Sequence, residues 1–291
     1  MATTQPIKTR IKVLKEDYDR LRLGHASLLG MIDEAEVPES VYNSNAIENS
    51  TLTLKETEKI LLEMEVSRDV SLREVFEAKN LARVIGYVRE KSQQEEVAKE
   101  NILLLHQMLI GNIKDGIAGR FRGEGEYVRV GSFIAPSPEH VERMLEDALL
   151  QYSSSHETYF TDNIARFHLE FETIHPFVDG NGRIGRVLVN YQLMRFGFPP
   201  VIIQDKEKKE YYRSFSEYRD DKNTKTMEHI ITRALCESLH KRIAYLAGMR
   251  IVPLAEHAKT LGKPVPVILN AARRQTIQAF REKGVWKMGI G

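Results

Sequence analysis

Apolar side chains recur at helical spacing along most of the chain. In the N-terminal part they are three, four or seven positions apart, which places them on one face of an amphipathic helix. The residues concerned are Ile11, Leu14, Tyr18, Leu21 and Leu28. This spacing predicts a first helix over the whole stretch, followed by a short connecting segment around residues 37–44.

Two capping-box patterns predict further helix starts. In such a box, a Ser or Thr and a Glu three residues later satisfy backbone N–H groups at the beginning of a helix. Thr53-Leu-Lys-Glu56 and Ser71-Leu-Arg-Glu74 both fit this pattern, and apolar residues at helical spacing follow each of them. We therefore expect helices to begin at these two places, and another to run from about Glu96 to Ile110.

The stretch from residue 111 to 138 breaks the helical pattern, because six glycines fall within it. Tyr127-Val-Arg-Val130 alternates as a strand does, and Ser132-Phe-Ile-Ala-Pro136 offers it a partner. Helical spacing resumes at Pro138 and continues to about Gly248. The predicted fold class is therefore mostly all-α, with one short β-hairpin.

Composition limits the kinds of protein this chain can be. The 291 residues are 42% hydrophobic and 29% charged, and the formal net charge of +1 gives no overall preference for nucleic acid or membrane. Cys236 is the one cysteine, which excludes a disulfide framework and fits a reducing compartment. The longest apolar stretch, Ile102–Ile110, is far shorter than the ~20 residues that a membrane span needs. We expect a soluble, cytoplasmic protein without a membrane partner.

The C-terminal tail is more basic than the rest. Residues 250–291 contain eight Lys and Arg residues against two Glu. Their pattern of a helix, a glycine turn, a second helix and a terminal strand pair is typical of a winged helix-turn-helix. Pro264 and Pro266 stand where a recognition helix would begin, which argues against DNA. Binding of DNA and docking of a partner protein stay open as alternatives for this tail.

The densest group of reactive side chains is His175-Pro-Phe-Val-Asp-Gly-Asn-Gly-Arg-Ile-Gly-Arg186. The apolar helix that precedes it cannot continue through Pro176, so His175 is expected at the C-terminal edge of that helix. Gly180-Asn-Gly182 then allows the backbone to turn into a new helix. The free N–H groups at the start of a helix, together with its dipole, form a site for an anion.

The charged residues of this segment suit a bound phosphate. Arg183 and Arg186 are three positions apart and so lie on the same side of the new helix, where they add two cations. Asp179 can ligate Mg²⁺, which in proteins commonly takes one carboxylate together with substrate phosphates. His175 is the side chain suited to act as a general base near neutral pH.

Three other interpretations compete with this one. Residues 180–185 match the Gly-x-Gly-x-x-Gly dinucleotide fingerprint, but that fingerprint follows a strand and here a helix precedes it. His168, Glu172 and His175 are spaced four and three residues apart and could form the metal-binding face of a hydrolase. A plain glycine turn with surface arginines is the third, and it leaves the density of reactive side chains unexplained.

Residues 175–186 resemble the signature of the Fic family, His-x-Phe-x-Asp/Glu-Gly-Asn-Gly-Arg-x-x-Arg, and match it at every fixed position. The resemblance covers about residues 100–235. It implies a helical Fic (Fido) core with a short β-hairpin flap at about residues 120–136, plus a small C-terminal winged-helix-like domain. The implied division is an N-terminal helical region 1–95, a catalytic core 96–249 and a basic tail 250–291.

The same resemblance implies an activity, namely transfer of AMP from ATP to a Tyr, Thr or Ser hydroxyl of a target protein with release of pyrophosphate. His175 would be the base and Asp179 would hold Mg²⁺. The phosphates would be bound by Gly180, Asn181, Gly182, Arg183 and Arg186. Tyr211 and Tyr212 follow the helix of the motif and are candidates for an adenine pocket.

The flap is implied to bind the target protein as an added β-strand, through main-chain hydrogen bonds. Its residues are Val128, Arg129, Val130, Gly131, Ser132 and Phe133. Main-chain pairing specifies few side chains, so the sequence leaves the target unidentified. Self-modification is expected, and a homodimer is a further partner prediction.

Ser44-Asn-Ala-Ile-Glu-Asn49 resembles the inhibitory motif of the family, Ser/Thr-x-x-x-Glu-Gly/Asn. It implies an inhibitory helix at about residues 40–50, in which Glu48 pairs with Arg186 and takes the place of the ATP γ-phosphate. The plain alternative is a helix capped by Ser44 with a surface glutamate.

Other functions stay open at this point. The fold could transfer another phosphate-containing group, or it could remove AMP from a modified protein (de-AMPylation). In a non-enzymatic alternative, the core senses a nucleotide and the tail binds DNA as a regulator.

Overall fold

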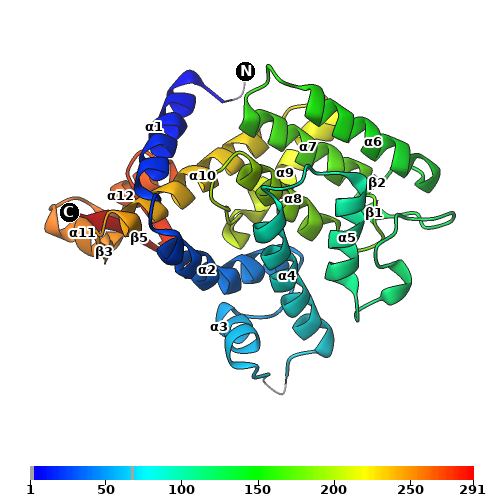
Figure 1. The fold of residues 1–291 in the computed structure, drawn as a ribbon, viewed down its shortest axis with the longest axis horizontal. Coiled ribbons are helices and arrows are strands. Elements are labelled where there is room, and N and C mark those ends of the chain that lie inside the picture. The colour runs from blue at the N-terminus through cyan, green and yellow to red at the C-terminus, as the bar shows by residue number, and fades with distance from the viewer. Residues whose placement is uncertain (1–2, 67–68) are drawn as a thin grey trace.

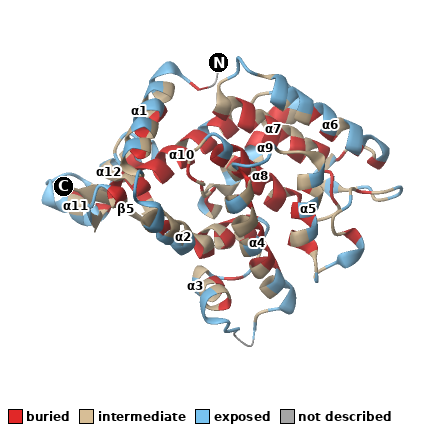
Figure 2. Cartoon of the chain, in the orientation of Figure 1, coloured by how far each residue is buried: buried red, intermediate tan, exposed pale blue. Residues whose placement is uncertain are grey.

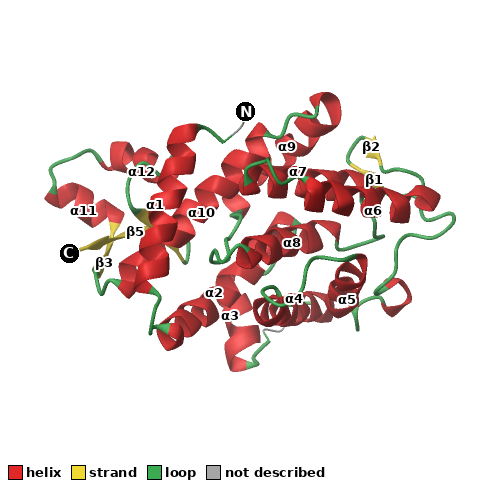
Figure 3. Ribbon diagram, turned by 45° about the horizontal axis from the view of Figure 1, so that its top comes forward, coloured by secondary structure: helices red, strands yellow, loops and turns green. Residues whose placement is uncertain are grey.

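The computed structural model describes residues 3–66 and 69–291, and most of these residues are helical (Figures 1 and 3). The N-terminal elements are α1 (Gln5–Leu21), α2 (Ala26–Ile47), α3 (Leu54–Glu58), the π-helical turn η1 (Lys59–Glu63), α4 (Leu72–Lys91), α5 (Lys99–Ile110) and the 3-10 turn η2 (Asp115–Ile117). The central elements are β1 (Arg129–Val130), β2 (Phe133–Ile134), α6 (Pro138–Ser154), α7 (Phe160–Ile174), α8 (Asn181–Arg195), the 3-10 turn η3 (Asp205–Glu207), α9 (Lys208–Asp221) and α10 (Lys225–Leu246). The C-terminal elements are β3 (Arg250–Pro253), α11 (Leu254–Thr260), α12 (Val265–Arg273), β4 (Ala279–Glu282) and β5 (Val285–Ile290). The predicted fold class, mostly all-α with small β elements, is confirmed.

Helices α7, α8 and α10 form the centre of the molecule and are buried over most of their length (Figure 2). Two apolar clusters flank them. One includes Leu81 of α4, Leu105 of α5 and Phe171 of α7. The other includes Ile11 of α1 and Leu235 of α10. Because α7 and α8 contribute to both clusters, the turn between these two helices is held from two sides.

The N-terminal helices differ from the prediction. The first helix ends at Leu21, and Leu28 belongs to α2 instead. Helix α2 then continues through residues 37–44, where a connecting segment was predicted, with Pro38 inside it. Proline removes one helical hydrogen bond, but tertiary contacts compensate here, since Asp33 and Glu36 of α2 both accept from the buried guanidinium of Arg242.

The capping boxes occur as predicted. The Thr53 side chain accepts a hydrogen bond from the Glu56 N–H, the Glu56 carboxylate accepts one from the Thr53 N–H, and α3 begins there. Ser71 likewise accepts from the Glu74 N–H at the start of α4. These interactions join residues three positions apart, which is why the sequence pattern identifies them.

The β elements are short. Strands β1 and β2 pair antiparallel, with Arg129 opposite Ile134 and Val130 opposite Phe133, so the predicted hairpin is confirmed in a shorter form. At the C-terminus, β3, β5 and β4 form an antiparallel sheet in that order beside α11 and α12. The predicted helix pair and terminal strand pair are both present, and β3 is an additional strand. The hairpin and this C-terminal unit lie at opposite ends of the molecule (Figures 1 and 3).

Among the described residues, no helix combines the length and the apolar character that crossing a membrane requires.

Candidate active site

His175 lies at the C-terminal end of α7, as the sequence predicts. Pro176 ends the helix, and His175 adopts a left-handed backbone conformation with φ of 51°. Its imidazole is 14% exposed, and Nδ1 lies 3.4 Å from the carbonyl oxygen of Glu172. Burial lowers the pKa of His175 to about 4. The ring is therefore neutral at physiological pH, with the proton assigned to Nδ1 beside that acceptor and a lone pair available on Nε2.

The turn between α7 and α8 is held by the side chain of Asn181. Its amide oxygen accepts from the Phe177 N–H at 2.9 Å, and its amide nitrogen donates to the Phe177 carbonyl at 2.8 Å. Gly180 has φ of +86°, which side-chain-bearing residues rarely adopt. Helix α8 begins directly afterwards, so its first N–H groups have no partner within the helix. Asn181 thus shapes the anion-binding turn, and a contact of its second side-chain N–H with phosphate stays a prediction.

Arg186 is buried and joins α8 to the N-terminal region. Its guanidinium donates to the Ser44 hydroxyl at 3.0 Å, the Ser44 carbonyl at 2.8 Å and Glu48 Oε1 at 2.9 Å. It also donates to the Tyr211 hydroxyl at 3.2 Å. Ser44 lies on α2, and Glu48 caps the end of that helix. The two residues that the sequence analysis paired, Glu48 and Arg186, are therefore in contact.

The end of α2 is fixed by α9. Asn49 has a positive φ of 69° and accepts a hydrogen bond from Lys208 through its side-chain oxygen. The Tyr212 hydroxyl donates to the carbonyl of Ile47 at 3.0 Å. These contacts hold Glu48 against Arg186.

Asp179 faces two arginines. Its Oδ1 accepts from Arg183 at 3.1 Å and its Oδ2 accepts from Arg73 of α4 at 2.8 Å. Glu77, one turn along α4, pairs with both of these arginines. A single carboxylate that opens onto a phosphate-binding turn is the protein donor that Mg²⁺ takes together with nucleotide phosphates. Asp179 therefore fits a magnesium ligand, provided that one of its guanidinium partners moves.

One polar cavity of about 430 Å³ lies among these groups, a size typical of small-molecule sites. Arg186 does not border this cavity itself but contacts Glu48, which does. His175, Asp179, Gly180, Asn181, Gly182, Arg183, Glu48, Tyr211 and Tyr212 border it, with Val128, Arg129, Val130 and Gly131 of the flap. Ser132 and Phe133 do not, and the ring of Phe133 instead packs against the guanidinium of Arg219. The structure thus brings most of the predicted site residues together, including four of the six flap residues.

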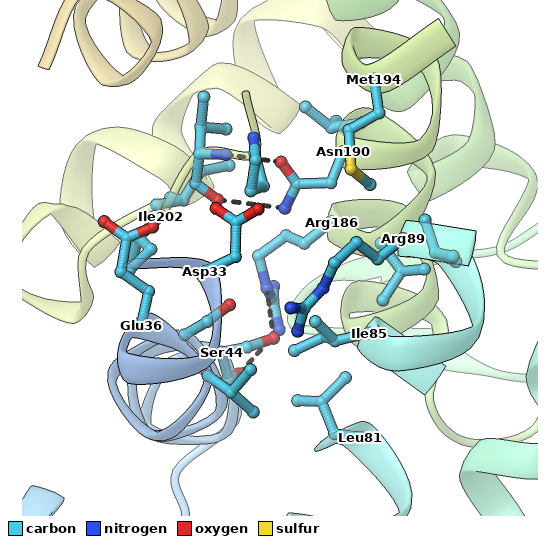
Figure 4. Close-up of a pocket in the computed structure, with 18 residues that line it drawn as sticks. Asp33, Glu36, Ser44, Leu81, Ile85, Arg89, Arg186, Asn190, Met194 and Ile202 are labelled. Carbon is cyan, nitrogen blue, oxygen red and sulfur yellow. Dashed lines mark hydrogen bonds between the residues drawn. The ribbon is translucent and has the colours of Figure 1, made fainter. Parts of the chain in front are cut away.

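A second, mainly apolar pocket lies between α2, α4 and α8, where Ser44 and Arg186 contact each other (Figure 4). Leu81, Ile85 and Met194 contribute to its walls, and it encloses about 60 Å³. This volume is far too small for a nucleotide, so the polar cavity is the candidate active site.

Two of the competing interpretations are not supported. Helix α7, not a strand, precedes the glycine turn, so the dinucleotide fingerprint lacks its required context. His168 is buried, and its Nε2 lies 2.8 Å from the Tyr211 hydroxyl. Within residues 3–66 and 69–291, no group of three or more His, Cys, Asp or Glu side chains is arranged to hold a metal ion.

The two tyrosines differ in their roles. Tyr211 is fully buried, and its hydroxyl joins Arg186 to His168. In this structure it supports the arginine, and its ring packs against those of Tyr212 and Phe215. Tyr212 is partly buried at the cavity wall, and it stays a candidate for adenine contact.

The sequence did not predict two residues of the site or the protonation state of a third. Arg73 and Glu77 come from α4, far from the motif. Burial and the nearby Glu48 carboxylate raise the pKa of Glu172 to about 8, so this carboxyl group beneath Gly185 is largely protonated at neutral pH. No local pattern reveals that state, because it depends on burial by other helices.

Two further residues brace the site from the flap side. The His106 ring stacks on the Phe177 ring with 3.7 Å between the ring centroids. Its Nε2 lies 3.0 Å from the Asp179 carbonyl oxygen. Arg122 donates to the carbonyls of His175 at 2.8 Å and Pro136 at 2.8 Å. Arg122 therefore links the base of the flap to the backbone of the candidate catalytic histidine.

The geometry defines a class of protein, a helical domain with a histidine, a carboxylate and an anion-binding turn beneath a β-hairpin. The model of the Fic/DOC family matches residues 96–193. Protein adenylyltransferase fic-1 from Caenorhabditis elegans is 33% identical over 207 residues, which are 69% of this chain and 40% of that protein. Protein adenylyltransferase Fic from Nematostella vectensis is 34% identical over 228 residues, or 76% of this chain and 51% of that protein. The chain thus spans about half, or less, of the length of these curated relatives.

Solved structures agree with this assignment. Fic-1 from Caenorhabditis elegans matches 83% of this chain and 73% of its own with a TM-score of 0.71 at 25% identity. A Fic domain containing signaling protein from Bacteroides thetaiotaomicron covers 82% of this chain and 97% of its own with a TM-score of 0.73. At 23% identity, that second match supports the fold alone. The chain therefore contains a Fic/DOC family domain, which the family model places at residues 96–193.

Proposed function

We propose that this protein transfers AMP from ATP to a hydroxyl side chain of a target protein and releases pyrophosphate. The observation that carries the proposal is that a neutral, mostly buried histidine, a carboxylate and an anion-binding helix start border one cavity of about 430 Å³. The names of the curated relatives, protein adenylyltransferases, support the same activity.

In the proposed reaction, Nε2 of His175 accepts the proton of the target hydroxyl. The hydroxyl oxygen then bonds to the α-phosphorus of ATP, and the bond between that phosphorus and the α,β-bridging oxygen breaks. The electron pair leaves with pyrophosphate. A pKa of about 4 keeps His175 in its basic form, so it can accept the proton at neutral pH.

The charges of ATP would be met by the start of α8. The N–H groups of the turn at Gly180 and Gly182 and the guanidinium of Arg183 lie beside the same cavity. Arg186 would bind the terminal phosphate once it is released from Glu48. Asp179 would hold Mg²⁺, whose bound charge would stabilise the leaving pyrophosphate. Most of the rate in phosphoryl chemistry comes from such positioning and charge stabilisation.

We infer that Glu48 inhibits this reaction. Its carboxylate contacts Arg186 at 2.9 Å, which removes a phosphate-binding cation from service. Ser44 and Asn49 support the inhibitory position, Ser44 by accepting from Arg186 and Asn49 by accepting from Lys208. The flap strand β1 would pair with an extended segment of the target, because it belongs to a two-stranded sheet and only its edge toward β2 is paired.

Intact mass spectrometry after incubation with Mg·ATP tests the function, the base and the inhibitor together. We expect little change in the wild type, addition of AMP to Glu48→Gly, and no addition to Glu48→Gly with His175→Ala. Equal modification of the wild type and Glu48→Gly would contradict inhibition and leave the transferase intact. Loss of AMP from a modified sample on prolonged incubation would indicate de-AMPylation, and an adduct of another mass would indicate a different transferred group.

A second function is supported by the tail. Lys259, Lys263, Arg273 and Arg274 on and beside α11 and α12 are exposed, and none has an acidic partner in the described residues. We propose that this surface binds duplex DNA. Fluorescence anisotropy with a labelled duplex should show affinity that falls steeply with salt. Affinity unchanged in Arg273→Ala with Arg274→Ala would contradict the assignment and favour docking of a partner protein.

A homodimer is also proposed, and sedimentation velocity over a range of protein concentrations tests it directly.

A further inference from the structure

Four charged residues form a closed ring at the edge of the cavity. Arg73 donates to Asp179 Oδ2 at 2.8 Å and to Glu77 Oε1 at 3.1 Å. Arg183 lies 3.1 Å from Asp179 Oδ1 and 3.2 Å from Glu77 Oε1. Positive and negative groups alternate around the ring, so each carboxylate contacts both arginines. Arg73 and Glu77 lie on α4, outside the segment that the family model matches.

The ring occupies both oxygens of the carboxylate that the proposed function gives to Mg²⁺. A divalent cation binds Asp179 only if one guanidinium leaves it. Arg183 is 4% exposed, whereas the side chain of Arg73 is 60% exposed. An exposed ion pair is weak, because water competes for both partners. Arg73 is therefore the partner that can leave.

A second contact keeps Arg73 at the site when it leaves Asp179. Its Nε is held by Glu77, which is only 12% exposed and belongs to the same helix. Rotation of the outer part of the side chain can take Nη2 away from Asp179 while the contact with Glu77 persists. The guanidinium then stays beside the cavity, next to the place of the nucleotide phosphates.

The residues joined by ion pairs at the site are balanced in charge. Three arginines face three carboxylates, namely Arg73, Arg183 and Arg186 against Glu48, Glu77 and Asp179. A metal ion bound to Asp179 while Arg73 is still in place would lie beside the positively charged guanidinium that contacts the same carboxylate. Metal and Arg73 thus exclude each other.

We propose that Arg73, held by Glu77, is a positioning residue that takes the place of the divalent cation at Asp179 and competes with it. The inference rests on the proposed function only through the role of Asp179 as the metal ligand. When the divalent cation and the nucleotide bind, the cation displaces Arg73 from Asp179, and Arg73 turns toward the nucleotide phosphates.

The test measures binding of Mn²⁺ alone, without nucleotide, by electron paramagnetic resonance of the free ion. We expect Arg73→Ala to bind Mn²⁺ roughly two- to fivefold more tightly than the wild type, the range that an exposed ion pair allows. Arg83→Ala is the matched control, because Arg83 is on the same helix and donates to the Met108 carbonyl instead. It should leave Mn²⁺ affinity unchanged. Asp179→Ala, combined with Arg73→Ala, should abolish the gain.

Equal Mn²⁺ affinity of Arg73→Ala and the wild type would overturn the inference, as would the absence of Mn²⁺ binding by Arg73→Ala or a gain that survives loss of Asp179. Thermal unfolding of each variant verifies that the proteins are folded. The proposed function is judged separately, by AMP addition to Glu48→Gly. Failure of the metal competition with AMP addition intact would leave the transferase standing without this role for Arg73.

Discussion

At the residue scale, the site depends on ionisable groups whose charge is set by burial. His175 loses most of its contact with water at the end of α7, and Glu172 is enclosed between α7 and α8. Removing water disfavours the charged form of either group, so the histidine pKa falls and the carboxyl pKa rises. The result is a neutral base beside a neutral acid.

This state of His175 predicts the pH dependence of the reaction. The acid limb of the kcat/KM profile reports the pKa of the essential base in the free enzyme. For Glu48→Gly, this apparent pKa should therefore lie below the ordinary histidine value of about 6.5. Removal of Glu48 strengthens the effect, because that carboxylate raises the pKa of His175. Initial rates of AMP addition from pH 4.5 to 8 measure the profile. An acid limb at or above pH 6.5 would contradict the neutral, buried base.

Glu172 predicts a pH-dependent stability. Its folded pKa of about 8 lies above its unfolded value, so its contribution is complete below about pH 4.5 and is lost as pH rises through 8. Glu172→Gln mimics the protonated form and avoids that loss. The gain in Tm over the wild type should therefore be larger at pH 8 than at pH 5. Each kcal/mol of avoided loss in the free energy of unfolding corresponds to about 2–4 °C in Tm. Differential scanning calorimetry measures it, with the exposed Glu157→Gln as control, and a gain equal at both pH values would contradict it.

At the scale of elements, α2 is the part that presents the inhibitor. Its C-terminal end is fixed by hydrogen bonds from another helix, since Lys208 of α9 donates to the Ala46 carbonyl and to Asn49 Oδ1. The position of Glu48 is therefore shared between α2 and α9. A loosened end of α2 should release Arg186 part of the time.

Lys208→Met tests this link while it keeps most of the apolar stem. A hydrogen bond of this kind contributes about 0.5–1.5 kcal/mol, so the basal rate of AMP addition should rise roughly two- to tenfold above that of the wild type. Lys209→Met is the control, because Lys209 is exposed and has no polar contact in the described residues. A rate unchanged by Lys208→Met, while Glu48→Gly is active, would show that α9 does not hold the inhibitor.

At the scale of the whole molecule, the C-terminal unit is attached to α2. The turn between β4 and β5 donates its Lys283 and Gly284 N–H groups to the carboxylate of Glu39, which is 5% exposed. Arg281 of β4 forms ion pairs with Glu237 and Glu207. The tail therefore touches the helix that presents Glu48.

Glu39→Ala should destabilise the molecule, because it leaves two partly buried N–H groups without an acceptor. The expected loss in the free energy of unfolding is about 1–3 kcal/mol, measured by urea denaturation. Glu34→Ala, at an exposed position of the same helix, should cost far less. Equal losses for the two variants would show that the contact with the tail contributes nothing.

How far the sequence predicts these features depends on the distance over which each interaction acts. The boxes at Thr53 and Ser71, the helix break at Pro176 and the turn at Gly180 join residues within a few positions, and the structure contains all of them. The connecting segment predicted at residues 37–44 is wrong, because these residues continue helix α2. The helix is held there by contacts of Asp33 and Glu36 with Arg242, which lies far away in the sequence. Local patterns cannot contain such long-range compensation.

The sequence by itself determined the chemistry of the segment from His175 to Arg186, since the residue types and their spacing are local properties of the chain. It also suggested the partner of Arg186 through a second motif. Only the tertiary structure decided that Glu48 meets Arg186 across 138 residues and that Arg73 meets Asp179 across 106. The protonation of Glu172 was decided in the same way. The physical reason is that burial and ion pairing depend on which helices pack together, and that packing is a property of the whole hydrophobic core.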